Sequence, residues 1–396
     1  MSLTDTPNAN RLHIALFGRR NSGKSSLINA LTGQDIALVS NTPGTTTDLV
    51  SKAMEIQGIG PCLFIDTPGF DDEGELGELR ISRTLKAIEK TDIALLLCED
   101  TTFFHEKEIL ALLKEKNIPV IPVLNKIDIR ENSDHLATYI EEQCKIHPLL
   151  ISAKEKIGIE LIRQAILEKL PSDFGQQSIT RELVTENDLV LLVMPQDIQA
   201  PKGRLILPQV QTIRELLDKK CLVMNCTTDK FSATLQALAR PPKLIITDSQ
   251  VFKAIYEQKP KESELTSFSV LFAGYKGDIH YYVESAAVIE RLTESSRVLI
   301  AEACTHAPLS EDIGRVKLPR LLRKWIGENL QIDMVAGTDF PQDLTPYSLV
   351  IHCGACMFNR KYVLSRIERA REQHIPMTNY GVAIAFLNGI LDQIKY

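Results

Sequence analysis

The stretch "LHIALFGRRNSGKSSLINALTG", residues 12–33, decides how the chain begins to fold. An apolar strand pattern comes first, helical spacing comes last, and the segment between them has the G-x-x-x-x-G-K-S spacing of a phosphate-binding loop. Two glycines allow backbone N–H groups to turn toward phosphate oxygens. Lys24 supplies a positive charge for the terminal phosphates, and the Ser25 hydroxyl can ligate Mg²⁺. The nucleotide-binding residues expected here are Gly18, Asn21, Ser22, Gly23, Lys24, Ser25 and Ser26.

Three later motifs complete the nucleotide site, and each follows an apolar strand pattern. They are "DTPG" at 66–69, "NKID" at 125–128 and "SAK" at 152–154. "DTPG" places Asp66 beside the magnesium shell and the Gly69 N–H near a γ-phosphate. "NKID" ends in Asp128, whose carboxylate can accept hydrogen bonds from the ring N–H and the exocyclic amine of guanine, which adenine cannot match. Because the carboxyl ends of parallel strands lie at one edge of a sheet, these motifs are expected to meet and to select GTP. The base-side residues are Asn125, Lys126, Asp128, Ser152, Ala153 and Lys154.

The 396 residues exceed one ordinary domain, since domains usually hold about 100–200 residues. Short strand patterns alternate with helical ones along the whole chain, which predicts an α/β protein built from parallel sheets. We expect three consecutive α/β domains, a P-loop GTPase over 1–170, a small dimerisation domain over 175–267, and a metal-binding domain over 268–396. In the last domain the predicted strands are 268–273, 296–303, 330–335 and 347–352.

Bulk properties exclude some classes of function. A formal net charge of -6 gives no overall attraction to nucleic acid or to an anionic membrane. No signal-peptide pattern and no apolar run near the ~20 residues of a membrane span is visible, so we expect a cytoplasmic protein. Its eight cysteines should then be reduced, which favours metal binding or catalysis for clustered thiols. Cys221 and Cys226, at the ends of one predicted strand, are interpreted as core thiols.

Two segments of the last domain carry thiols and imidazoles directly after predicted strands: "EACTHAP" at 302–308 and "LVIHCGACMF" at 349–358. Their shared position at strand ends predicts that five side chains converge. A thioredoxin-like pair would leave three of the five unexplained, whereas a zinc site and a three-thiolate [4Fe–4S] cluster both fit and stay open on ligand chemistry alone. Gly354 is expected to let the loop bend around a sulfur. The candidate ligands are Cys304, His306, His352, Cys353 and Cys356.

Residues 11–170 resemble the TrmE–Era group of GTPases. In that group "NTPGTTTD" at 41–48 would be the first switch, which implies that Thr46, or its neighbour Thr45, senses Mg²⁺. The resemblance also implies that Asn21 ligates a K⁺ ion that stimulates hydrolysis. Phe70 follows the second-switch glycine where Ras-like enzymes have a water-orienting glutamine, so slow intrinsic hydrolysis is expected. The catalytic candidates are Lys24, Thr46, Gly69 and Glu75, the last from an acidic stretch that is otherwise a solvated loop.

The whole chain resembles the HydF family of [FeFe]-hydrogenase maturation GTPases, because its GTPase motifs precede a CxH and then an HCxxC segment. The resemblance implies that Cys304, Cys353 and Cys356 hold a [4Fe–4S] cluster, with His306 and His352 nearby or ligating. It further implies a scaffold that carries a diiron precursor with carbon monoxide and cyanide ligands. Radical SAM maturases and apo [FeFe]-hydrogenase would be its partners, and the chain would form a homodimer or a tetramer.

Two other functions fit parts of the sequence. A ribosome- or tRNA-associated GTPase would need a basic RNA-binding module, and none is recognisable. A GTPase with a structural zinc site would use the same ligands as the iron–sulfur protein. The basic segment "GRVKLPRLLRK" at 314–324 predicts either a positive surface for an anionic cluster or acidic partner, or an ordinary solvated helix face.

Overall fold

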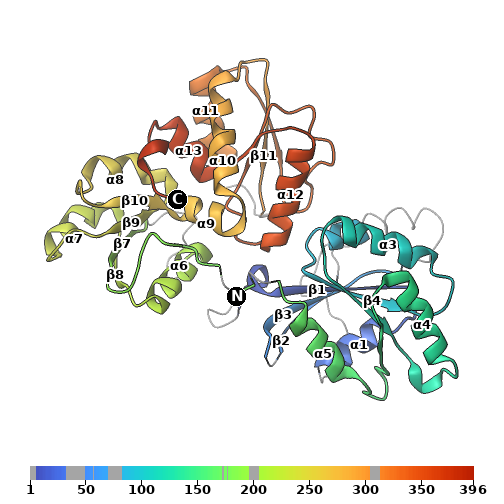
Figure 1. Cartoon of the computed structure of the whole chain (residues 1–396). Helices are drawn as coiled ribbons and strands as arrows, with labels where there is room; N and C mark the ends of the chain where they lie inside the picture. The colour runs from blue at the N-terminus through green and yellow to red at the C-terminus, as the bar shows by residue number, and fades with distance from the viewer. Residues whose placement is uncertain are drawn as a thin grey trace. The chain divides into compact units, whose positions relative to one another are not determined.

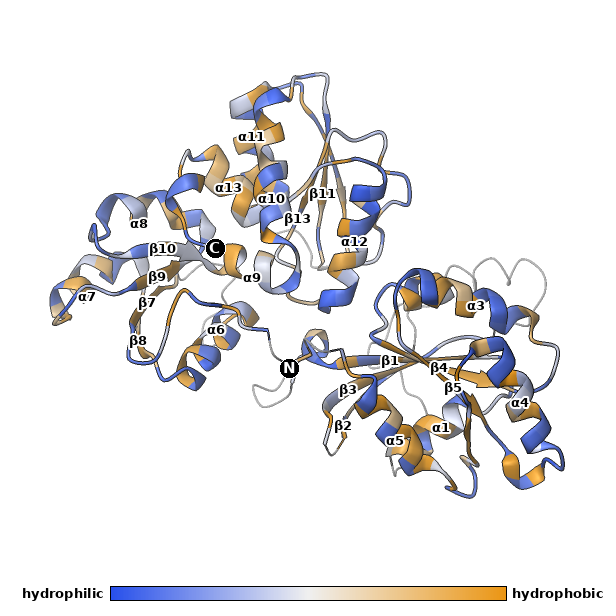
Figure 2. Cartoon of the chain, viewed as in Figure 1, coloured by the Kyte–Doolittle hydropathy of each residue, from blue (hydrophilic) through white to orange (hydrophobic). Residues whose placement is uncertain are grey.

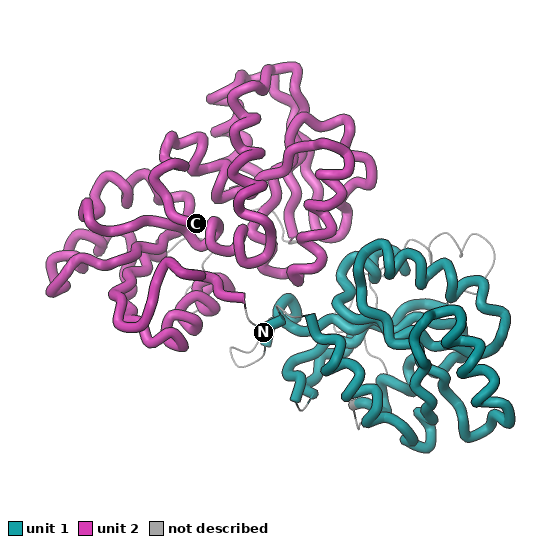
Figure 3. The backbone as a smooth tube through the Cα atoms, viewed as in Figure 1, with its two compact units in different colours: residues 1–176 teal, residues 177–396 magenta. Residues whose placement is uncertain are grey.

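The computed structural model describes residues 6–32, 50–56, 58–69, 83–171, 174–175, 177–195, 205–303 and 313–396. The chain forms two compact units, residues 1–176 and 177–396 (Figure 3). Helices and mostly parallel strands alternate in both units (Figure 1), so the predicted α/β class is confirmed. Within the described residues, no helix combines the length and apolar character that crossing a membrane requires.

The first unit is built on a six-stranded sheet in the order β2-β3-β1-β4-β5-β6. Every neighbouring pair is parallel, as predicted, except β2 and β3, which pair antiparallel at one edge. These two strands are joined by a short connection, which suits antiparallel pairing because a parallel pair needs a long crossover. The strands are β1 (Leu12–Gly18), β2 (Val50–Ile56), β3 (Gly60–Asp66), β4 (Ile93–Cys98), β5 (Val120–Leu124) and β6 (Leu149–Leu150).

Helices cover both faces of this sheet because its central strand is buried on both sides. All seven residues of β1 are buried, and its side chains alternate between two cores. Leu12, Ile14 and Leu16 pack with α1 and α5, whereas Ala15 and Phe17 pack with α3 and α4. Figure 2 shows the apolar strands between helices with polar outer faces. The helices are α1 (Lys24–Thr32), α3 (Phe104–Glu115), α4 (Ser133–Cys144) and α5 (Ile159–Glu168).

The second unit contains two four-stranded parallel sheets. The first has the order β10-β9-β7-β8, and the second has the order β12-β11-β13-β14. The strands are β7 (Leu189–Val193), β8 (Leu222–Cys226), β9 (Leu244–Thr247), β10 (Glu264–Ser267), β11 (Arg297–Ala301), β12 (Gln331–Val335), β13 (Leu349–His352) and β14 (Met377–Asn379). The helices are α6 (Leu207–Asp218), α7 (Phe231–Ala237), α8 (Phe252–Gln258), α9 (Phe268–Lys276), α10 (Ile279–Ala286), α11 (Leu318–Ile326), α12 (Arg360–Glu372) and α13 (Tyr380–Leu387). Single helical turns occupy Asn8–Asn10, Ile127–Ile129, Thr228–Lys230, Ser249–Val251, Ala287–Arg291, Ile313–Lys317 and Leu391–Gln393.

Helix α9 occupies the segment "FSVLFA" that was expected to be a strand, so that prediction is wrong. The Ser267 side chain caps the helix by accepting a hydrogen bond of 3.2 Å from the Val270 N–H. The helix is apolar on all sides because it packs into two cores at once: Phe268 and Phe272 enter one, and Val270 and Ala273 enter the other. Such a short, uniformly apolar segment has no periodicity that distinguishes a buried helix from a buried strand.

Candidate functional site

The phosphate-binding loop turns from β1 into α1 through two positions, Gly18 and Gly23, that have no room for a side chain. Asn21 and Gly23 have positive φ angles of 62° and 91°. A Cβ atom on Gly23 would lie 2.2 Å from Nδ2 of Asn125, and one on Gly18 would lie 2.7 Å from Oγ of Ser22. Both glycines are therefore required by close packing, and the loop is held in a shape whose N–H groups can surround a phosphate.

Lys24 begins helix α1 and is only 8% exposed. Its Nζ donates hydrogen bonds to the carbonyl oxygens of Gly18, at 2.8 Å, and Arg19, at 2.7 Å. The ammonium group is thus held by the loop's own backbone. A phosphate oxygen can replace these carbonyls as acceptor, since charge-assisted hydrogen bonds to an anion are stronger than those to a neutral carbonyl.

Asp66 and Ser25 form the part of the site that can accept a magnesium ion. The Ser25 hydroxyl donates to Oδ2 of Asp66 at 2.7 Å, across the gap between α1 and the end of β3. Oδ1 of Asp66 is buried and has no hydrogen-bond partner in the described part of the chain. Burial raises the pKa of Asp66, while the Ser25 hydrogen bond and the charge of Lys24 oppose the rise. A desolvated carboxylate with an unsatisfied oxygen suits a hard divalent cation, so these residues fit Mg²⁺.

Asn125 connects three loops of the nucleotide site. Its Nδ2 donates to the Ser22 carbonyl at 3.0 Å, and its Oδ1 accepts from the N–H groups of Lys126, at 2.8 Å, and Ala153, at 3.0 Å. The side chain is 3% exposed. These contacts join the phosphate-binding loop to both base-side motifs. The three loops expected to bind one nucleotide are therefore hydrogen-bonded to each other.

Asp128 lies in the single turn after β5, where its carboxylate is exposed to a ligand. A hydrogen bond from Ser152 is the main reason why the pKa of Asp128 lies below its usual range. The carboxylate is therefore ionised at neutral pH and can accept two hydrogen bonds from one base. Lys126 adopts a left-handed backbone, and its Nζ lies 3.1 Å from Oε1 of Glu99. The Lys154 side chain is 81% exposed, and its Nζ lies 3.7 Å from a carboxylate oxygen of Glu155.

Sequence reasoning missed Arg19, the residue that fixes the other side of the phosphate-binding loop. Its guanidinium lies 2.9 Å from a carboxylate oxygen of Asp100 and 2.9 Å from one of Glu106, and it also donates to Thr102. Glu106 is only 1% exposed. The partners follow β4, more than eighty positions along the chain, and no local pattern around Arg19 indicates them.

Part of each predicted site lies outside the described residues. This applies to both switch candidates, and to the first of the two thiol segments. The residues concerned are Thr45, Thr46, Phe70, Glu75, Cys304 and His306.

The described half of the thiol site lies at the carboxyl end of β13. The Cys353 sulfur accepts hydrogen bonds from the backbone N–H groups of Ala303, at 3.0 Å, and Ala355, at 3.4 Å. Burial raises the pKa of the Cys353 thiol to about 11, and these two N–H groups oppose the rise. Ala355, with φ 51°, is the residue of this loop that has a left-handed backbone, and Gly354 does not. Among the described residues, no atom lies within 4 Å of a Cβ built on Gly354.

His352 is fully buried, and both of its ring nitrogens already have partners. Nδ1 lies 2.8 Å from the Cys353 carbonyl oxygen, and Nε2 lies 2.8 Å from a guanidinium nitrogen of Arg366. Burial, and then the charge of Arg366, lower the pKa of His352 to about 3, so the ring is neutral at physiological pH. Among the described residues, no three of histidine, cysteine, aspartate and glutamate come together as metal ligands. Cys353 and Cys356 remain the described thiols of this site.

Three family models match the chain. The model for the hydrogen maturase F tetramerization domain matches residues 280–395, and the model for its dimerization domain matches residues 179–277. A 50S ribosome-binding GTPase model matches residues 13–126. The chain belongs to the hydrogen maturase F family. The family expected from the GTPase motifs and the cysteine segments is thereby confirmed, and so is the P-loop GTPase domain at the beginning of the chain.

Curated relatives are similar to part of this hydrogen maturase F chain. The tRNA modification GTPase MnmE of Dechloromonas aromatica is 40% identical over 159 residues, 39% of this chain and 34% of the relative. MnmE of Nitrosomonas europaea is 39% identical over 160 residues, 40% of this chain and 34% of the relative. The chain thus spans about a third of the length of these relatives.

Solved GTPase structures are also similar to this chain. Aquifex aeolicus Era bound to GDP and aluminium fluoride is 22% identical, with a TM-score of 0.35, and the match covers 54% of this chain and 92% of Era. The G domain of the T. maritima FeoB iron transporter is 24% identical, with a TM-score of 0.33, and the match covers 40% of this chain and 98% of that domain.

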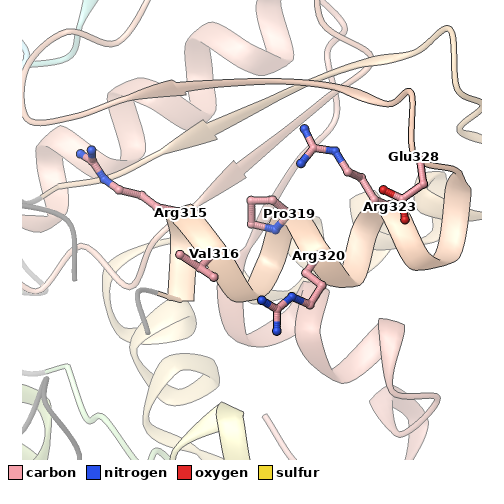
Figure 4. Close-up of a pocket in the computed structure, with 6 residues that line it drawn as sticks. All are labelled: Arg315, Val316, Pro319, Arg320, Arg323 and Glu328. Carbon is pink, nitrogen blue, oxygen red and sulfur yellow. The ribbon is translucent and has the colours of Figure 1, made fainter. Parts of the chain in front are cut away.

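The basic segment 314–324 leads into and forms helix α11 in the maturase tetramerization region. Arg315, Arg320 and Arg323 line a pocket of ≈ 300 Å³ together with Val316, Pro319 and Glu328 (Figure 4). Arg315 pairs with Glu302 at 3.1 Å. In Figure 4 the Arg315 and Arg323 side chains extend to one side of the helix, and the Arg320 side chain extends to the other.

Strand β8 forms an edge of the first sheet of the second unit, inside the maturase dimerization region. Two apolar side chains on it are exposed, Leu222 at 51% and Met224 at 39%. Cys226 at its end is half-buried and packs on the core, while Cys221 just before it is buried. An edge strand with exposed apolar side chains is a template for pairing with another chain.

Proposed function

We propose that the chain is a GTP-driven maturation factor that holds a diiron precursor and delivers it to apo [FeFe]-hydrogenase. The observation that carries this proposal is that two backbone N–H groups hold the Cys353 sulfur at the end of a strand. The first unit of the same chain matches a GTPase model. Backbone N–H donors to sulfur stabilise a thiolate, the form of cysteine that binds iron. The hydrogen maturase F models over the rest of the second unit support the client.

In the GTPase unit, each described residue has a role that its contacts support. Lys24 exchanges backbone carbonyls for the terminal phosphates, and Ser25 with Asp66 holds Mg²⁺. Asp128 reads guanine, and Asn125 keeps the base-side loops aligned. Water attacks the γ-phosphorus, the bond to the β-phosphate oxygen breaks, and GDP and phosphate are released. Gly69, Thr46 and Glu75 are proposed for the γ-phosphate, for Mg²⁺ sensing and for orienting water, and Asn21 for K⁺.

In the second unit, we assign Cys304, Cys353 and Cys356 as the three thiolates of a [4Fe–4S] cluster. Three thiolates leave one iron to a different ligand, and this iron can anchor the diiron cargo. His306 is the remaining candidate for the fourth ligand, since both nitrogens of His352 are engaged within the protein.

Self-assembly is part of the proposal. The edge of β8 would pair with the same strand of a second copy, because its exposed Leu222 and Met224 would be buried by that contact. The tetramerization region would join two such dimers. Radical SAM maturases would supply the precursor. A Met224→Lys variant is expected to elute as a monomer or a weakened dimer in light-scattering chromatography, while a Lys114→Ala control stays assembled.

The first experiment is anaerobic reconstitution with iron and sulfide, followed by metal analysis and EPR of the reduced protein. The expected result is about four irons per chain and a reduced-cluster signal, both lost in Cys353→Ala. Cys221→Ala is the matched control, because this buried thiol lies outside the site. Stoichiometric zinc with no cluster assembled after its removal would replace the proposal with a GTPase that has a structural zinc domain.

A further inference from the structure

Arg366, on helix α12, is the largest fully buried side chain in the described part of the molecule, at 1% exposure. Three aromatic rings surround its guanidinium: the centroids of Phe340, Phe358 and Tyr362 lie 4.7, 4.6 and 4.8 Å from Cζ. The group also donates to the Gly337 carbonyl at 2.6 Å and to His352. Rings on this many sides stabilise a desolvated cation and fix its position.

The partners of Arg366 among the described residues are a carbonyl, an imidazole, a tyrosine hydroxyl and aromatic rings, and none of them is a carboxylate. Burying an arginine is costly unless an opposite charge compensates for it. The aromatic rings and the carbonyl supply part of the compensation, but neither carries a negative charge. The proposed thiolate at Cys353 belongs to the residue next to the histidine that Arg366 contacts. A resident anion there would complete the charge balance.

The contact with Arg366 fixes how His352 uses its two nitrogens. A guanidinium only donates hydrogen bonds, so Nε2 must be the acceptor and Nδ1 must carry the proton. Nδ1 then donates to the Cys353 carbonyl at 2.8 Å, and Asn379 donates to the same carbonyl at 3.3 Å. The backbone of Cys353 is thus fixed from one side, while Ala303 and Ala355 hold its sulfur from the other.

We propose that Arg366 is the built-in countercation of the thiolate site, and that it keeps His352 as a positioning residue outside the ligand set of the iron. This inference rests on the proposed [4Fe–4S] function of the second unit. A cluster with three thiolates is anionic and gains a further negative charge on reduction. A fixed cation in a dry environment stabilises that reduced form.

The test compares reconstituted wild-type protein with Arg366→Met and Arg366→Lys. Arg369→Met is the matched control, because Arg369 lies on the same helix, also stacks on Phe340 at 5.6 Å and also donates to a backbone carbonyl, that of Pro341. In Arg366→Met we expect iron to pass to a chelator about tenfold faster and the midpoint potential to fall. Arg366→Lys keeps the charge, so its midpoint potential should fall less. Arg369→Met should match wild type in both measurements. Pulsed EPR of protein labelled with ¹⁵N-histidine measures the hyperfine coupling between the cluster and histidine nitrogen. If His352 is not an iron ligand, His352→Gln should remove no strong coupling from the wild-type spectrum.

Unchanged potential and iron retention in a folded Arg366→Met protein would overturn the inference while leaving the cluster function intact. A strong histidine coupling that disappears in His352→Gln would overturn it equally. If Arg366→Met does not fold, Arg366→Lys and the histidine coupling decide the question. Failure of the wild-type protein to assemble any cluster would instead reject the proposed function, and the inference with it.

Discussion

The nucleotide site and the thiol site both lie at the carboxyl ends of parallel strands, but each holds its principal cation differently. Lys24 bonds to two carbonyls of its own loop, so a phosphate can displace these weak acceptors. Arg366 is enclosed by three rings and has no such freedom. On the proposed functions, the exchangeable phosphates would meet a cation on replaceable contacts, whereas the resident cluster would lie near a cation that the fold immobilises.

The largest expected effect comes from removing the Lys24 ammonium group. Lys24→Ala should weaken GDP and GTP binding about a thousandfold, because two charge-assisted hydrogen bonds of roughly 2 kcal/mol each are lost. Fluorescent-nucleotide titration measures the change. Lys114→Ala, an exposed lysine on α3, is the control and should bind like wild type. Comparable affinity in the two variants would mean that Lys24 does not reach the phosphates.

Breaking the bonds between the loops tests whether the nucleotide site is organised in advance. Asn125→Ala removes three buried hydrogen bonds and should lower the free energy of unfolding by about 2–3 kcal/mol. Chemical denaturation of the nucleotide-free protein measures this. Asn132→Ala is matched to it, since Asn132 is exposed and its side chain forms no cap on α4. An Asn125→Ala protein as stable as the control would show that the loops are ordered only by the ligand.

The aromatic surroundings of Arg366 can be weakened without touching the cation itself. Phe358→Leu keeps most of the apolar volume but removes one ring, so a loss of about 1 kcal/mol of stability is expected. Thermal unfolding of the protein without metal measures this change. Phe386→Leu replaces a ring that lies beside Trp325 and not beside Arg366. Equal losses in both variants would show that the rings act only through packing.

The smallest effect concerns pH at the base-reading end of the nucleotide site. The Ser152 hydrogen bond keeps the pKa of Asp128 below its ordinary value, so the ionised carboxylate persists as the pH falls. Ser152→Ala should let that pKa rise toward about 3.9, and guanine affinity should then decline at a higher pH than in wild type. GDP titrations between pH 3.5 and pH 7 compare the two; identical profiles would remove Ser152 from this role.

The sequence predicted what depends on local spacing and missed what depends on distant partners. The loop of Gly18 to Ser25 and the motifs ending β3 and β5 carry their geometry in adjacent residues. Arg19 and Arg366 could not be found this way, because their partners lie on segments that only the fold brings near. Ala355 shows a second limit, because nothing in the sequence around an alanine indicates that it adopts a left-handed backbone. Strand β2 lacks a continuous apolar run, since its antiparallel edge position does not require one.

Helix α9 has a consequence for how the second unit comes apart. Its side chains belong to two cores, with Leu271 and Phe272 in one and Val270 and Ala273 in the other. If either sheet lost its packing, the apolar side chains of α9 that pack in that core would be exposed to water. The two sheets should therefore melt together in one cooperative transition, and a chain cut at residue 267 should yield two fragments that aggregate.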